Sequence, residues 1–132
     1  MAITPIIKGK IFIALDFDGT ITTEQEDNFG EYQLQPFCKE VIMALHNTGK
    51  VHFGIWSCRS APQMKTARAF LEKEGLLEYM EHLNGDFKEI MDIYEQPNRK
   101  SSADIYIDDR AMWGEVDWVD IYIRVMDIVN KL

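Results

Sequence analysis

Polar side chains that can do chemistry follow three short apolar segments of the chain, at the points where those segments end. They are Asp16 and Asp18 after the first segment, Ser57 after the second, and Asp108 and Asp109 after the third. Two carboxylates about 4 Å apart repel by about 4 kcal/mol at an effective dielectric near 20, so a cluster of them needs a cation. Ligand sets made only of oxygen suit Mg²⁺, which often takes phosphate as a further ligand. The pattern therefore predicts a phosphoryl-transfer site.

The apolar segments themselves are typical of strands buried on both faces of a parallel sheet. They run over residues 10–16, 51–57 and 105–109, and a weaker strand is expected near Leu83. In parallel sheets, ligands bind outside the carboxyl ends of the strands. The polar residues that end these segments are therefore expected to share one edge of the sheet.

Helices are expected between the strands, on the evidence of capping residues, glycine stops and apolar spacing. They begin near Pro36, Ser60 and Asp117, with one further helical turn within residues 87–93. The residues expected to face inward from the last helix are Trp118, Ile121, Tyr122 and Val125. The alternation of strands and helices predicts one α/β domain over residues 1–132, a three-layer parallel sheet covered on both faces.

Composition narrows the class of protein. The chain has 132 residues and a formal charge of −8, from 22 acidic and 14 basic side chains. This charge argues against a protein that coats nucleic acid or an anionic membrane. No apolar run approaches the roughly 18 residues that a membrane helix needs, and the first ten residues do not resemble a secretory signal. With only two cysteines, the chain is expected to be a cytoplasmic protein without disulfides.

The motifs resemble those of the haloacid dehalogenase (HAD) superfamily of phosphohydrolases. Asp16-Phe-Asp18-Gly-Thr20 after an apolar strand is similar to the first motif of that family. Ser57 matches the second motif of the family, and the pair Asp108 and Asp109 matches the fourth. Lys100 matches the third motif, a lysine, with Lys88 as the alternative. The resemblance spans residue 11 to about residue 110. The segments 55–59 and 103–110 further resemble small uncharacterised HAD-like proteins of bacteria and phages.

The resemblance implies a Rossmannoid core and a Mg²⁺-dependent phosphomonoester hydrolase. Asp16 would be the nucleophile that forms an aspartyl-phosphate, and Asp18 would be the general acid and base. Ser57 and Lys100 would complete the catalytic set. The implied metal ligands are Asp16, Asp18 through its backbone carbonyl, Asp108 and Asp109. The implied substrate contacts are Gly19, Thr20 and Arg59, although a solvated position is the ordinary expectation for an arginine such as Arg59.

The lengths of the connections predict a core without a cap domain. Only about 15 residues separate Thr20 from Pro36, too few for a folded module. Members of the family with open sites often act on larger substrates or take a lid from a partner chain. For this chain we expect a small or medium phosphorylated substrate, and the possibility of a homo-oligomer stays open.

Three other functions are also compatible with the sequence. One is a phosphatase or processing domain for nucleic-acid ends, which the negative charge disfavours unless basic residues gather at one rim. Another is a receiver-like signalling module that holds a phosphoryl group, although the acidic pair at 108–109 has no receiver counterpart. The third is a non-catalytic relative that keeps the fold for binding. Turnover of phosphate esters separates the enzyme from the last two.

Overall fold

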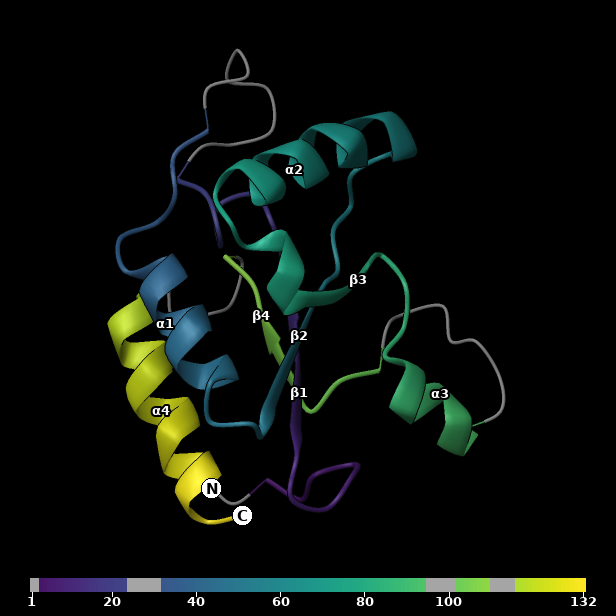
Figure 1. Ribbon diagram of the computed structural model, residues 1–132, viewed down its shortest axis with the longest axis vertical. Helices are drawn as coiled ribbons and strands as arrows, with labels where there is room; N and C mark the ends of the chain where they lie inside the picture. Colours follow the sequence, from purple (N-terminus) through teal and green to yellow (C-terminus); the bar gives the residue numbers. More distant parts are fainter. Residues whose placement is uncertain (1–2, 24–31, 95–101, 110–115) are drawn as a thin grey trace.

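Four parallel strands form a single sheet in the order β3-β2-β1-β4 in a computed structural model of the chain (Figure 1). The structure describes residues 3–23, 32–94, 102–109 and 116–132. The strands are β1 (Ile11–Leu15), β2 (Val51–Ile55), β3 (Met80–Leu83) and β4 (Ile105–Ile107). The helices are α1 (Cys38–His46), α2 (Ala61–Lys73), a 3₁₀ turn η1 (Leu77–Tyr79), α3 (Lys88–Tyr94) and α4 (Trp118–Asn130).

The central strand β1 is buried along its whole length because helical segments cover both of its faces. Its alternate residues Ile11, Ile13 and Leu15 belong to the main core cluster, which also holds buried side chains of α1, α2 and α4. Phe12 points to the opposite face and packs with Phe87 and Ile90 of the α3 region. In Figure 1, α1 and α4 lie side by side on one side of the sheet and α3 lies on the other. The predicted three-layer α/β fold is therefore confirmed.

Capping residues set the starts of two helices as the sequence predicts. Ser60 accepts a hydrogen bond from the Gln63 backbone, and the Gln63 side chain accepts one from the Ser60 backbone, which completes a capping box before α2. Asp117 accepts from the backbone N–H groups of the first turn of α4.

The buried stripe of α4 differs from the prediction at one position. Trp118 and Val125 are buried as expected, and Val129 extends their stripe. Tyr122 was expected inward but is 37% exposed, so that prediction is wrong.

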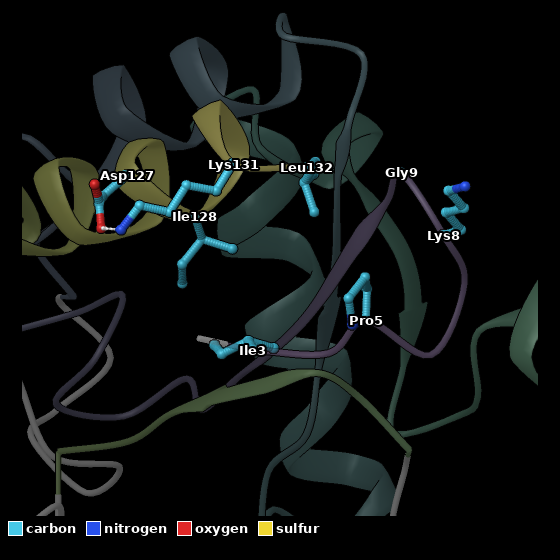
Figure 2. Close-up of a pocket in the computed structure, with 8 residues that line it drawn as sticks. All are labelled: Ile3, Pro5, Lys8, Gly9, Asp127, Ile128, Lys131 and Leu132. Atoms are coloured by element: carbon cyan, nitrogen blue, oxygen red, sulfur yellow. Dashed lines mark hydrogen bonds and ion pairs between the residues drawn. The ribbon is translucent and has the colours of Figure 1, made fainter. Parts of the chain in front are cut away.

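The rest of the described chain adds no further module to the sheet and its helices, in agreement with a core that lacks a cap. Within the same ranges, no helix is long and apolar enough to cross a membrane. A cavity of about 230 Å³ lies where the two ends of the chain meet, lined by residues such as Pro5, Gly9, Ile128 and Leu132 (Figure 2). Because Gly9 precedes β1 and Asp16 follows it, this cavity is at the edge of the sheet opposite to the acidic residues.

The core position of β1 leads to a stability prediction. Replacing the fully buried Ile13 by alanine leaves a void between β1 and the helices, and we expect a loss of about 2–5 kcal/mol in the free energy of unfolding. The matched control is Ile123→Ala on α4, because Ile123 is 61% exposed and should change stability by no more than about 0.5 kcal/mol. Urea denaturation of both variants measures the difference. Equal losses would contradict the assigned core.

Candidate functional site

The strand register places Asp16 beside Asp108. Leu15 of β1 is paired with Ile107 of β4, and the Asp16 backbone N–H donates to the Ile107 carbonyl at 3.0 Å. On the other side, Leu15 is paired with Ile55, and the Trp56 N–H donates to the Leu15 carbonyl at 2.8 Å. Three strands therefore end level with one another, and the residues that follow them emerge at the same edge.

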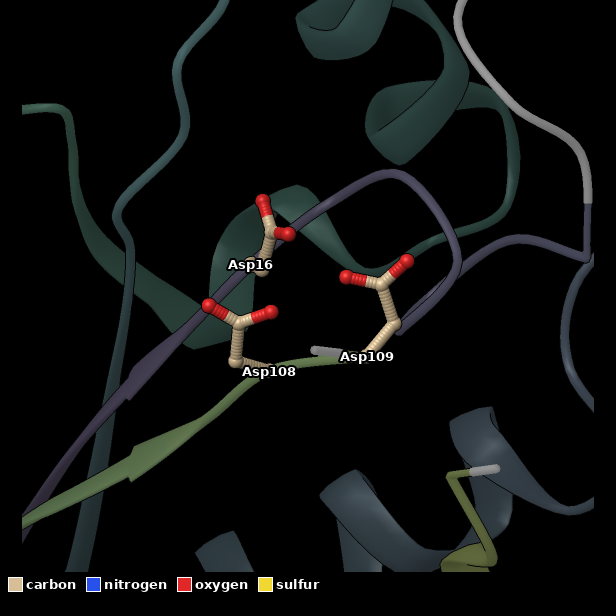
Figure 3. A group of neighbouring side chains, drawn as sticks. All are labelled: Asp16, Asp108 and Asp109. Carbon is tan, nitrogen blue, oxygen red and sulfur yellow. The ribbon is translucent and has the colours of Figure 1, made fainter. Parts of the chain in front are cut away.

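Three of the carboxylates predicted as metal ligands meet at this edge. Asp16, Asp108 and Asp109 each offer an oxygen, and these oxygens lie within 4.8 Å of one another. Figure 3 shows the three side chains turned toward a common space, Asp16 from the end of β1 and the other two from the end of β4. This donor set of oxygens alone is the kind that binds a hard divalent cation such as Mg²⁺.

A glycine allows the third carboxylate to approach. Gly19 has φ +76°, and a Cβ built on it would lie 2.3 Å from Oδ2 of Asp109. The position thus requires a residue that adopts the left-handed region and has no side chain. The substrate contact at Gly19 stays a prediction, and the structure shows that the missing side chain at Gly19 leaves room for Asp109.

The electrostatics of the cluster resist ionisation of Asp16. Burial is the main cause that raises the pKa of Asp16 from 3.8 to about 7, and the neighbouring carboxylates Asp108, Asp109 and Asp18 raise it further. The backbone N–H of Phe17, which donates to Oδ1 of Asp16 at 2.8 Å, acts in the opposite direction. A bound cation would favour the charged form of this carboxylate.

Asp18 lies outside the cluster of side chains and is paired with a buried arginine. Both of its oxygens accept from Arg59, at 2.9 Å from Nε and 2.7 Å from Nη2. Arg59 also donates to the Tyr32 hydroxyl and the Gln63 carbonyl, and its guanidinium lies over the rings of Phe17 and Tyr32. Burial lowers the pKa of Arg59, but the bonds to Asp18 and Tyr32 outweigh it, so the pKa is raised and the guanidinium stays charged.

The position of Arg59 differs from the solvated one that the sequence favours. Arg59 is only 5% exposed, and four of its hydrogen bonds end on protein atoms. A charge can be buried in this way because a carboxylate neutralises it and aromatic rings cover it. The structure thus assigns Arg59 to holding Asp18, and its contact with substrate stays a prediction.

The loop that follows Asp18 is held by side chains from other parts of the fold. Trp118 Nε1 donates to the Thr20 carbonyl at 2.8 Å, and Gln35 Nε2 donates to the Gly19 carbonyl at 3.0 Å. Thr20 itself is fully buried, and its hydroxyl has no hydrogen-bond partner among the described residues. The protein therefore encloses the Thr20 side chain, and its contact with a substrate stays a prediction.

Ser57 and the lysines complete the predicted set. Ser57 follows β2 at the carboxyl edge, and its Oγ accepts from the Arg59 backbone N–H at 3.2 Å. Lys100 lies outside the described residues. The alternative, Lys88, is the first residue of α3; its side chain is exposed and forms no ion pair with the described carboxylates.

Asn84 also contacts this region, although no motif or spacing in the sequence indicates it. Asn84, directly after β3, accepts a hydrogen bond through Oδ1 from the Ser57 backbone N–H at 2.6 Å. An asparagine in a polar stretch gives no periodic or motif signal. The Asn-Gly pair at 84–85 indicates only a turn.

Comparisons with known proteins support the fold. No protein-family model matches the chain, and no curated protein matches it. The solved structure of a conserved protein coded by a locus of Bacteroides thetaiotaomicron is similar, with a TM-score of 0.71 and 29% sequence identity. The match covers 89% of this chain and 91% of that one, so the two share their architecture over nearly their whole length.

The raised pKa of Asp16 predicts a specific dependence of stability on pH in the absence of metal. Between pH 3.8 and about 7, the folded protein keeps a proton that the unfolded chain has released. The contribution of Asp16 to the free energy of unfolding should therefore fall as the pH rises through this window. Urea denaturation in EDTA at pH 5 and pH 8 should show a smaller loss for Asp16→Asn than for the wild type. An unchanged loss would contradict the assignment.

The contact between Gly19 and Asp109 predicts a change in metal affinity. Gly19→Ala should displace Asp109 and weaken Mg²⁺ binding about tenfold or more. Because alanine disfavours the left-handed backbone, the same substitution should also lower the free energy of unfolding by about 1–2 kcal/mol. Gly9→Ala is the matched control, because Gly9 has φ +82° but no atom within 4 Å of the added Cβ. Isothermal titration with Mg²⁺ should show normal affinity for Gly9→Ala. A normal affinity for Gly19→Ala as well would show that Asp109 does not act as a ligand.

Proposed function

We propose that the protein is a phosphomonoester hydrolase of the haloacid dehalogenase type that requires Mg²⁺. The observation that carries this proposal is the convergence of Asp16, Asp108 and Asp109 at the carboxyl edge of a parallel sheet. Three carboxylates in so small a space repel one another, and burial adds to the cost for Asp16. A site that keeps them together is best explained by a divalent cation that binds there.

The residues fit the proposed Mg²⁺ site by their chemistry and placement. Asp16, Asp108 and Asp109 would hold the ion, together with the Asp18 backbone carbonyl that the motif resemblance implies. The ion would supply positive charge that reduces the repulsion between the Asp16 carboxylate and an anionic phosphate ester.

Asp16 is the proposed nucleophile because it is the first aspartate of the motif Asp16-Phe-Asp18-Gly-Thr20, which the resemblance to the haloacid dehalogenase family gives that role. A carboxylate oxygen of Asp16 attacks phosphorus, an aspartyl-phosphate forms, and the bond to the ester oxygen breaks. The leaving oxygen takes a proton from Asp18. A water molecule then attacks phosphorus, gives its proton to Asp18 and releases phosphate with a free Asp16.

The ion pair with Arg59 adds a requirement to this scheme. In the structure both oxygens of Asp18 accept from Arg59, so the guanidinium occupies both of them in this conformation. Asp18 must therefore turn at least one oxygen from Arg59 toward the leaving group and take up a proton there. The buried guanidinium would return Asp18 to the same position after each turnover.

The proposal is tested with purified protein and p-nitrophenyl phosphate, nucleotides, sugar phosphates and oligonucleotide 5′-phosphates. Wild-type protein should hydrolyse at least one of them with Mg²⁺ and lose this activity in EDTA. Asp16→Asn should lower kcat about 10³-fold or more, because removal of a nucleophile abolishes the reaction path. Asp127→Asn is the control, since Asp127 is exposed and pairs with Lys131 on the surface of α4.

Three outcomes would contradict the proposal. Activity that survives Asp16→Asn would exclude Asp16 as the nucleophile. Activity that persists in EDTA would exclude the metal requirement. A phosphoryl group that stays on Asp16 without turnover would favour the receiver-like alternative.

A further inference from the structure

Asn84 connects the end of β3 to the loop that follows β2. Its backbone lies in the left-handed region with φ 55°, which asparagine tolerates better than other residues that carry a side chain. Its N–H donates to the Ile55 carbonyl at 2.8 Å and so continues the pairing of β2 with β3. Its side-chain Oδ1 accepts from the Ser57 N–H at 2.6 Å. One residue thus fixes the backbone of Ser57 from a neighbouring strand.

The turn that carries Asn84 is itself well held. The ring Nδ1 of His82 accepts from the Gly85 N–H at 3.2 Å, and the same ring packs edge-on against Phe87 at a centroid distance of 4.5 Å. A Cβ on Gly54 would lie 2.2 Å from Nε2 of His82, so β2 leaves the space that this ring occupies. The His82 ring therefore ties the turn that carries Asn84 to Phe87 and to β2.

The hydrogen bonds around Ser57 leave one donor available. The Ser57 N–H is taken by Asn84, and Oγ accepts from the Arg59 N–H. A hydroxyl donates one hydrogen as well as accepting, and among the described residues that hydrogen has no acceptor. Arg59, whose backbone N–H binds Ser57, also binds Asp18 through its side chain. A continuous series of hydrogen bonds therefore joins the ends of β3, β2 and β1.

We infer that Asn84 is a positioning residue for the phosphate-binding hydroxyl of Ser57 and, through Arg59, for Asp18. This inference rests on the proposed function. Without Oδ1 of Asn84, the Ser57 backbone loses its fixed orientation, and its hydroxyl meets a phosphate oxygen less often in a productive geometry. Asn84 acts through Ser57 and does not itself take part in the chemistry.

The test compares two substitutions at the same position. Asn84→Gly keeps the left-handed backbone without strain but removes the acceptor, and Asn84→Asp keeps an acceptor oxygen. With p-nitrophenyl phosphate and Mg²⁺, Asn84→Gly should raise KM about 3- to 10-fold, the range expected from loss of one hydrogen bond. Amide hydrogen exchange at Ser57 should become faster in Asn84→Gly and return toward the wild-type rate in Asn84→Asp. Asn47→Gly, at the exposed C-cap of α1, is the control and should leave KM and the Ser57 exchange rate unchanged.

A double-mutant cycle separates positioning from a general structural effect. In a Ser57→Ala background, Asn84→Gly should change KM by less than about twofold, because the group it positions is gone. Full additivity, an unchanged KM in the single variant, or unaltered exchange at Ser57 would overturn the inference. Absence of Mg²⁺-dependent turnover in wild-type protein would instead overturn the proposed function, while the exchange measurement would still report on the bond between Asn84 and Ser57.

Discussion

The main constraint on this structure is an unfavourable interaction that the fold must withstand. Three carboxylates, those of Asp16, Asp108 and Asp109, lie close together at one edge of the sheet. Pairs of charges at such distances repel by a few kcal/mol even at an effective dielectric near 20. The hydrogen-bonded ladders of β1 to β2 and β4, the buried core beneath them and the absence of a side chain at Gly19 together hold the carboxylates in place. The packing of the core thus compensates for the electrostatic repulsion between the carboxylates. A bound cation would reduce that repulsion directly.

Local sequence signals predict most of the framework. Continuous apolar runs mark β1 and β2 because strands covered on both faces need no polar alternation. Ser60 and Asp117 mark helix starts because a side-chain oxygen there satisfies backbone N–H groups at the end of the helix. The shared edge of Asp16 and Asp108 follows from the parallel arrangement, since the carboxyl ends of parallel strands lie at the same edge of a sheet.

Residues whose roles depend on distant partners could not be predicted in the same way. Nothing near Arg59 in the sequence indicates that Asp18, Tyr32 and Phe17 surround it, so solvent exposure was the natural expectation. Asn84 becomes informative only when β3 is paired with β2, because its partner Ser57 is 27 positions away. Burial of Thr20 likewise results from packing around the loop and not from the local motif. These differences all concern tertiary contacts, which periodicity does not encode.

The pairing of β1 with β4 brings together residues about ninety positions apart in the chain. Contacts of such long range are slow to form, because closing a large loop costs entropy before the contact returns any stability. An unfolded chain therefore has no cation site, and an ion that binds this edge binds the native state alone. By mass action, a cation present at a hundred times its dissociation constant stabilises the folded form by about 2.7 kcal/mol. A cation bound at this edge would therefore lengthen the lifetime of the folded molecule in addition to any role in chemistry.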